Sequence, residues 1–145
     1  MEGHGKRVLI ADDEECVRRL IAVILERAGY NVYSVADGIE ALSEMKRRRF
    51  DAVIADCGMP RLDGVRLLLL SRMMWPQIPV LLLSAELMEL PELVREQGLC
   101  ALIPKPFDPQ DLLRTLQDTL SYMPEQSLRR PNGGRFIKNE MPVPR

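Results

Sequence analysis

Four short apolar runs, and one segment at residues 30–35 in which apolar and polar residues alternate, are separated along the chain by longer segments in which apolar residues recur every three or four positions. Apolar runs bounded by glycine, proline or polar residues are typical of strands buried on both faces of a parallel sheet. The longer segments have the periodicity of amphipathic helices. The pattern predicts strands at residues 7–11, 30–35, 51–56, 78–83 and 101–104, each followed by a helix.

The expected helices span about residues 14–28, 37–48, 64–74 and 91–97, and a last one runs from 108 onward. An apolar stripe on the first consists of Val17, Leu20, Ile21, Ile24, Leu25 and Ala28. Gly29 stops this helix, and Asp37 and Glu40 have the spacing of a capping box at the start of the second. Pro91 and Pro109 fit first turns, because a proline in mid-helix costs about 3 kcal/mol. Right-handed crossovers then make the chain an α/β domain, (βα)5, with a doubly wound five-stranded parallel sheet.

Length and charge limit the possible functions. At 145 residues the chain is expected to form one domain around one core. Its 20 basic and 21 acidic side chains give a net charge of −1, which does not favour nucleic acid as a partner. The basic run from Lys46 to Arg49 is interpreted as the solvated end of a helix. No apolar stretch reaches the ~18 residues of a membrane span and no signal-peptide pattern is present, so no membrane contact is expected.

Cysteine usage and the two ends of the chain complete this outline. The three cysteines lack metal-ligand spacing and suit a reducing compartment, so we expect a cytoplasmic protein. Residues 1–6 are expected to be a flexible lead-in to a domain at 7–122. Residues 123–145 are rich in proline, glycine and basic side chains and cannot bury enough apolar area to offset their ordering entropy. They are expected to be a flexible tail or the start of a linker.

Polar side chains follow four of the predicted strands at the point where each strand ends. Asp12 and Asp13 follow the first strand and Asp56 ends the third. Ser84 follows the fourth strand and Lys105 the fifth. In an open parallel sheet these positions share one edge, where ligands and chemistry collect. We therefore expect the five side chains to line one crevice.

These residue types suit phosphoryl chemistry. Asp12, Asp13 and Asp56 repel one another unless a divalent cation lies among them, and hard oxygen ligands suit Mg²⁺. A carboxylate can attack phosphorus to form an acyl phosphate, and Asp56 is the candidate nucleophile. Mg²⁺, the Lys105 ammonium and the Ser84 hydroxyl would neutralise charge on the phosphoryl oxygens. Lys105 is also expected to pair with Asp56 before any phosphorylation.

Each position also has a purely structural interpretation. Asp56 can be a turn former, Asp12 and Asp13 can cap a helix, and Ser84 can be a cap as well. Lys105 is less easily explained in this way, because prolines on both sides fix its direction. Independent structural roles would not be expected to fall on so many strand ends, so the functional interpretation is favoured.

From about residue 6 to residue 122 the chain resembles the receiver domain of two-component response regulators. The motifs that carry the resemblance, in the order and spacing of the family, are Val8-Leu9-Ile10-Ala11-Asp12-Asp13-Glu14, Asp56-Cys57-Gly58-Met59-Pro60-Arg61-Leu62-Asp63-Gly64, Pro79-Val80-Leu81-Leu82-Leu83-Ser84-Ala85 and Pro104-Lys105-Pro106-Phe107. The resemblance implies a flavodoxin-like fold with strand order 2-1-3-4-5.

The resemblance also implies a role for each candidate residue. Asp56 is expected to be the phosphoacceptor, Ser84 the switch hydroxyl and Lys105 the lysine that bonds the phosphoryl group. The Mg²⁺ ligands would be Asp12, Asp13, Asp56 and the backbone carbonyl of Gly58. Phosphate would come from the phosphohistidine of a sensor histidine kinase or a histidine phosphotransfer protein. The domain would be a switch read by a downstream protein or by a second copy in a homodimer. It would not be an enzyme beyond its own phosphorylation and slow dephosphorylation.

Some positions depart from the family pattern. Leu102 stands where an aromatic switch residue is common, Gly58 leaves one side of Asp56 open, and Glu86 places an acid near the approach to it. A hydrolysis rate different from that of pattern-typical relatives is therefore expected. Cys57 is expected to pack as a small hydrophobe and not to act as a redox thiol.

Three other classes are weighed against the switch. A phosphatase with an aspartate nucleophile would also use Mg²⁺, but it usually has a second acid two residues on, where this chain has Gly58. A receiver-like scaffold would not need the complete acceptor set. A nucleotide-binding module is disfavoured, because no predicted strand is followed by a glycine-rich phosphate loop.

Overall fold

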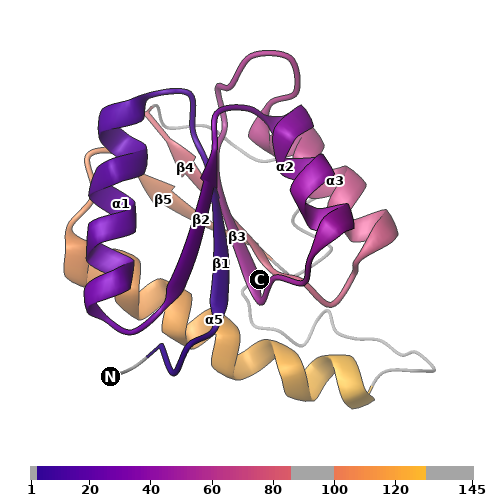
Figure 1. Ribbon diagram of the computed structural model, residues 1–145. Helices are drawn as coiled ribbons and strands as arrows, with labels where there is room; N and C mark the ends of the chain where they lie inside the picture. Colours follow the sequence, from indigo (N-terminus) through magenta and orange to yellow (C-terminus); the bar gives the residue numbers. More distant parts are fainter. Residues whose placement is uncertain (1–2, 86–99, 130–145) are drawn as a thin grey trace.

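The computed structural model describes the backbone of residues 3–85 and 100–129. Five parallel strands form one sheet in the order β2-β1-β3-β4-β5, which confirms the predicted topology (Figure 1). The strands are β1 Arg7–Ala11, β2 Asn31–Val35, β3 Ala52–Asp56, β4 Val80–Ser84 and β5 Cys100–Pro104. Each agrees with its predicted apolar run to within about two residues, as expected for sequence-based boundaries.

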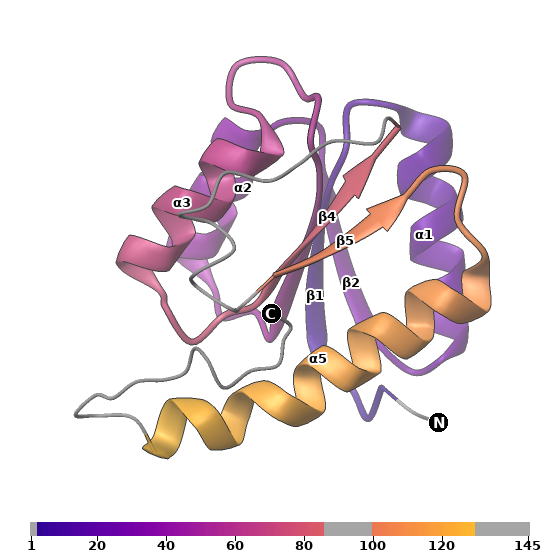
Figure 2. The same cartoon turned by 180° about the vertical axis from the view of Figure 1, so that it is seen from behind.

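Helices cover both faces of this sheet. They are α1 Glu15–Arg27, α2 Gly38–Arg47, α3 Gly64–Met74 and α5 Pro109–Arg129. In the two opposite views α1 and α5 lie on one face and α2 and α3 on the other, which is the doubly wound arrangement (Figures 1 and 2). The helix expected at residues 91–97 lies outside the described residues. No helix in the described part of the chain is long and apolar enough to cross a membrane.

The alternation of side chains along each strand divides the core in two. Leu9, Val53 and Leu82 face the layer of α2 and α3, whereas Ile54 and Leu81 face the layer of α1 and α5. All five side chains are fully buried. Burying a leucine or isoleucine contributes about 1.5–3 kcal/mol, so the central strands are held rigidly between two apolar layers.

Side-chain caps start two of the helices. The Asp37 carboxylate accepts a hydrogen bond from the Glu40 backbone N–H at 2.9 Å, and Glu40 Oε1 accepts one from the Ala36 N–H at 3.0 Å. The capping box predicted for α2 is thus present, with its return bond one residue earlier than Asp37. At α3 the Asp63 carboxylate accepts from the Arg66 N–H at 2.8 Å.

The turn that leads from β3 into α3 closes tightly on the strand end. A Cβ atom at Gly64 would lie 2.5 Å from the backbone oxygen of Asp56. Only glycine allows such an approach, so Gly64 sets how closely the start of α3 packs on the end of β3.

The apolar stripe of α1 is narrower than predicted. Ile21 and Leu25 are fully buried, but the side chain of Leu20 is 50% exposed. Successive helical residues are rotated by about 100°, so Leu20 falls to the side of the stripe centred on Ile21. The expectation that Leu20 faces the core is wrong.

The described part of the segment before β1 forms backbone hydrogen bonds with the turn between α1 and β2. The Gly3 N–H donates to Ala28 O at 2.7 Å, and the Gly5 N–H donates to Gly29 O at 2.9 Å. Gly29 has a φ of 96°, which only glycine adopts without strain, and ends α1 as predicted. The backbone at the α1–β2 turn therefore supplies hydrogen-bond partners that the sequence pattern did not reveal.

The last helix continues past the predicted domain boundary at residue 122 and ends at Arg129. The helix includes Pro124 and residues 125–129. The first part of the expected flexible tail is thus helical. The described chain begins and ends at the edge of the sheet where the strands start (Figure 1).

Candidate functional site

The carboxyl ends of the central strands meet at one edge of the sheet. Ala11 pairs with Ala55, so Asp12 and Asp56 each stand one residue beyond a paired position. Asp56 pairs in turn with Leu83, which directly precedes Ser84. The parallel register thus carries the predicted polar residues to the same edge, opposite the ends of the described chain (Figure 1).

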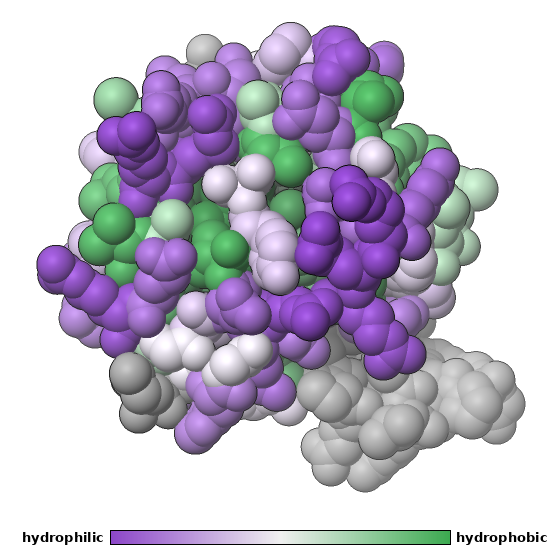
Figure 3. Space-filling view, in the orientation of Figure 1, coloured by the Kyte–Doolittle hydropathy of each residue, from purple (hydrophilic) through white to green (hydrophobic). Residues whose placement is uncertain are grey.

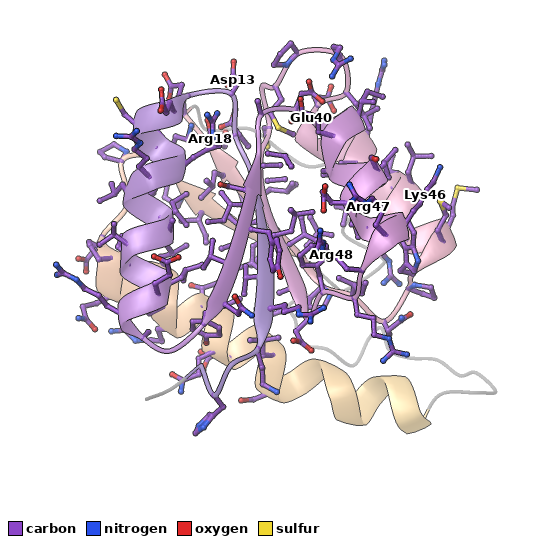
Figure 4. The ribbon with its side chains drawn as sticks, in the orientation of Figure 1. Asp13, Arg18, Glu40, Lys46, Arg47 and Arg48 are labelled. Carbon is purple, nitrogen blue, oxygen red and sulfur yellow. The ribbon has the colours of Figure 1, made fainter. Side chains whose placement is uncertain are left out.

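Three carboxylates cluster at this edge. Ligand oxygens of Asp12, Asp13 and Asp56 all lie within 4.8 Å of one another. Asp12 and Asp56 are buried, whereas Asp13 is exposed and stands where β1 ends (Figure 4). Like charges at this separation repel, so the cluster favours a neighbouring cation.

Lys105 supplies one such cation. Its Nζ lies 2.7 Å from Asp56 Oδ1 and 3.3 Å from Asp12 Oδ2, which confirms the expected ion pair with Asp56. The Glu14 carboxylate, at 3.8 Å, is more distant. The backbone N–H of Lys105 donates to Ser84 O at 2.7 Å, so the ends of β4 and β5 are joined beside the carboxylates.

The pKa values at this edge reflect burial and charge together. Burial raises the pKa of Asp12, and the nearby charge of Asp56 raises it further, against the opposing effect of the Glu14 N–H and Lys105. Burial alone would lower the pKa of Lys105, but its hydrogen bond to Asp56 and the charge of Asp12 outweigh burial and raise it. One lysine thus stays protonated among three carboxylates, which leaves an excess of negative charge.

The carboxylates retain free binding capacity for a metal ion. Asp12 Oδ1 accepts from the Glu14 N–H at 2.9 Å. Asp12 Oδ2 is fully buried and receives no well-directed hydrogen bond from any described residue, although Lys105 Nζ is 3.3 Å away. A buried carboxylate oxygen whose one cationic neighbour is poorly aligned can still accept a further cation. Carboxylate oxygens are the hard ligands that Mg²⁺ prefers, so the donor set fits this ion.

The space beside Asp56 is open at Gly58. The Gly58 N–H donates to Asp56 Oδ2 at 3.0 Å. Among the residues that the structure describes, a Cβ atom at Gly58 would have only that same oxygen within 4 Å, at 3.6 Å. Within the described part of the chain, this agrees with the interpretation that Gly58 leaves one side of the carboxylate open.

Two apolar positions near the site, Cys57 and Leu102, differ in their exposure. Cys57 packs against the core under α2 and α3, which confirms its expected role, and burial raises the pKa of its thiol to about 11. Such a thiol is neutral at ordinary pH and unreactive. Leu102 on β5 is 36% exposed. Glu86 lies outside the described residues.

Two arginines near the site were not singled out by the sequence. Arg18 of α1 donates from Nη1 to the backbone oxygen of Asp12 at 2.8 Å (Figure 4). Arg61, in the loop after β3, donates to the Asp37 carboxylate. Contacts between separate elements leave no mark in apolar periodicity, which is why neither was predicted.

Comparisons with known proteins agree with this geometry. A family model described as "Response regulator receiver domain" matches residues 8–117. The alkaline phosphatase synthesis transcriptional regulatory protein PhoP of Bacillus subtilis (strain 168) is 33% identical over 109 residues, 74% of this chain and 45% of that protein. The chain spans about half the length of the curated relatives it matches.

This chain also matches solved structures of similar proteins, and each match covers almost the whole length of the solved chain. The Vibrio cholerae chemotaxis protein CheY4 matches with a TM-score of 0.73 and 34% identity, over 79% of this chain and 98% of that one. The receiver domain of sensor histidine kinase PA1611 from Pseudomonas aeruginosa PAO1, solved with a magnesium ion coordinated in the active site cleft, has a TM-score of 0.72 and 30% identity, over 81% of this chain and 98% of that one. The chain belongs to the family of response regulator receiver domains of two-component systems.

Proposed function

We propose that this domain is a phosphorylation-controlled switch that accepts a phosphoryl group on Asp56. The observation that carries the proposal is the position of Asp56 Oδ1 2.7 Å from Lys105 Nζ, within a cluster that also contains Asp12 and Asp13. A nucleophilic carboxylate beside a fixed ammonium and a cation-binding cluster is the arrangement that phosphoryl transfer requires.

The residues have distinct parts in the proposed transfer. An Asp56 oxygen forms a bond to phosphorus as the bond from phosphorus to the histidine nitrogen of the donor breaks, and the released imidazole takes up a proton. Lys105 offsets the charge on the phosphoryl oxygens, and the buried Ser84 hydroxyl lies at the neighbouring strand end to donate to one of them.

Asp12, Asp13, Asp56 and the backbone carbonyl of Gly58 would hold Mg²⁺. When bound, Mg²⁺ supplies further neutralisation of phosphoryl charge. The fit of the carboxylate set to a cation and the magnesium ion in the structure of the similar PA1611 receiver domain support this part of the proposal.

The phosphoryl donor is proposed to be a sensor histidine kinase or a histidine phosphotransfer protein, acting in the cytoplasm. The acyl phosphate is later lost when water attacks phosphorus, which returns the Asp56 carboxylate and releases inorganic phosphate. The domain acts on no external substrate. The output is a protein surface read by a downstream target or a second copy. The match covers 45% of the relative from Bacillus subtilis, so that protein contains further chain outside the matched part.

A phosphatase is the second candidate, and the geometry does not favour it. The residue two after Asp56 is Gly58, which carries no side chain to protonate a leaving group. Without such an acid, turnover on a general phosphoester is not expected.

Intact mass measurement after incubation with acetyl phosphate and Mg²⁺ tests the proposal. We expect one added phosphoryl group in the native chain, and none in Asp56→Asn or after metal chelation. Asp118→Asn, which removes an exposed carboxylate of α5, is the matched control and should accept the group normally. An adduct that persists in Asp56→Asn, or no adduct in the folded native chain, would show that the proposal is wrong.

A further inference from the structure

A groove of about 820 Å³ lies at the edge of the sheet where the strands begin, opposite Asp56. Its lining comes from the end of α2 and the following loop, the turn between α3 and β4, the residue before β1, and α5. These segments are distant in the sequence, and none of them belongs to the acidic site.

One side of the groove is basic. Lys6, Lys46 and Arg49 line it and are exposed, and they have no acidic partner among the residues whose side chains the structure describes. Asp51 also lines the groove, but its Oδ2 accepts a hydrogen bond from the Arg7 backbone N–H at 2.8 Å. Figure 3 shows strongly hydrophilic side chains gathered around the lower end of α2. With the three cations of Lys6, Lys46 and Arg49 against the one carboxylate of Asp51, the rim of the groove has a net positive charge.

Two further arginines at this end of α2 are already engaged (Figure 4). Arg47 and Arg48 pair with Glu44 at 3.3 Å and 3.0 Å. Arg48 also stacks over the ring of Tyr33, 4.6 Å from its centroid. Glu44 thus offsets part of the positive charge of Arg47 and Arg48, which are not counted among the free cations of the rim.

The other side of the groove is apolar. Trp75 is half-buried there, and Ile78 and Leu120 form the buried floor. Just before Trp75, the side chains of Met73 and Met74 are 79% and 49% exposed. Large exposed apolar side chains next to a groove are typical of contact surfaces.

We propose that this groove binds an acidic peptide segment of another protein, which pairs its carboxylates with Lys6, Lys46 and Arg49 and places an apolar side chain beside Trp75. The free cations select negative charge, and the Trp75 side requires an apolar anchor, as in the core of a protein interface. The chain's own residues 130–145 carry four basic side chains and one acidic side chain, so charge complementarity does not favour them. Nucleic acid is disfavoured because the cations lie on one side only and the chain has a net charge of −1.

Trp75 is the only tryptophan of the chain, so its fluorescence reports on the groove directly. The test is a titration of the full chain with a pool of short synthetic peptides of Asp, Glu, Leu, Phe and Ser. A second pool has Lys in place of the acids, and single-stranded oligonucleotides form a third arm. The variant is Lys46→Glu with Arg49→Glu. The matched control is Arg19→Glu with Arg27→Glu, the same change of charge on exposed positions of α1, with the fold of both checked by circular dichroism.

We expect saturable changes in Trp75 emission with the acidic pool only, weakened by salt and at least about tenfold weaker in the groove variant but not in the control. No saturable response to the acidic pool, or equal binding by both variants, would overturn the proposal. Tighter binding of the oligonucleotide, lost in the groove variant, would assign the groove to nucleic acid instead. The groove lies away from Asp56, so none of these results bears on the phosphoryl chemistry.

Discussion

Arg61 donates two hydrogen bonds to one carboxylate oxygen of Asp37, from Nε at 2.9 Å and from Nη2 at 2.6 Å. Asp37 is the buried N-cap of α2, and Arg61 lies in the loop that follows Asp56, with a left-handed φ of 68°. The pair therefore connects the loop after Asp56, the candidate phosphoacceptor, to the start of α2. A non-glycine residue in this conformation needs a contact to hold it, and Asp37 provides one.

The first prediction concerns the stability contributed by this pair. Arg61→Ala should lower the free energy of unfolding by about 1–2 kcal/mol, because the Asp37 carboxylate loses a charged partner while it stays buried. The Arg61 side chain is 56% exposed, so the loss should stay below that for a fully buried pair. Urea unfolding measures the change, with Arg66→Ala as the control. Equal effects of the two substitutions would contradict the prediction.

The second prediction is a pH dependence. Burial would raise the pKa of Asp37, but the Glu40 N–H and Arg61 outweigh burial and lower it below the ordinary value of 3.8. The stabilisation from this carboxylate is therefore complete well above pH 3.8 and is lost as the pH falls through the lower value of the folded state. The difference in unfolding free energy between the native chain and Asp37→Asn should be constant near neutral pH and shrink in acid. A difference that grows in acid would mean that the pKa is raised.

The third prediction separates stability from metal binding. The pKa of Asp12 is raised by burial and by Asp56, so its charged form destabilises the fold at neutral pH in the absence of metal. Asp12→Asn should then raise the free energy of unfolding by on the order of 1 kcal/mol. Added Mg²⁺ should stabilise the native chain but not the variant. Denaturant titrations of both chains, with and without Mg²⁺, measure these changes. If the metal-free variant is less stable than the metal-free native chain, the prediction is wrong.

The fourth prediction rests on the proposed switch and concerns the open side of Asp56. Gly58→Met would place a bulky apolar side chain next to Asp56 Oδ2, the one described atom within 4 Å of a Cβ at this position. It should slow loss of the phosphoryl group several-fold, because the attacking water is displaced. The decay of the phosphorylated mass over time gives the rate. The control is Ser43→Met, on the exposed surface of α2. A glycine such as Gly5 is less suitable, because its φ of 77° would strain a methionine.

The sequence was sufficient to predict the sheet and the residues at its carboxyl edge. The alternation of apolar runs with helical segments predicts parallel strands. Parallel pairing then brings the strand ends at Asp56 and Ser84 to the same edge. Strand order required the family resemblance, because apolar runs do not reveal which strands are neighbours. The distances from Lys105 to Asp12 and Asp56 needed the structure.

Contacts between separate elements could not be predicted in this way. Arg61 and Asp37 are 24 residues apart, and no periodicity connects them. The groove beside Trp75 is built from several such segments, so the basic run at Lys46 appeared as an ordinary solvated helix end. Leu20 was misplaced because a stripe of apolar positions does not show where packing stops.

The ends of the described chain have a practical consequence. Both lie at the edge of the sheet where the strands begin, whereas the carboxylates lie at the opposite edge (Figure 1). A tag, a fluorescent protein or an attachment to a sensor chip, joined at the amino terminus, would therefore leave the carboxylate edge facing solution. Labelled or immobilised forms of this protein should keep the carboxylate edge accessible without redesign of the linker.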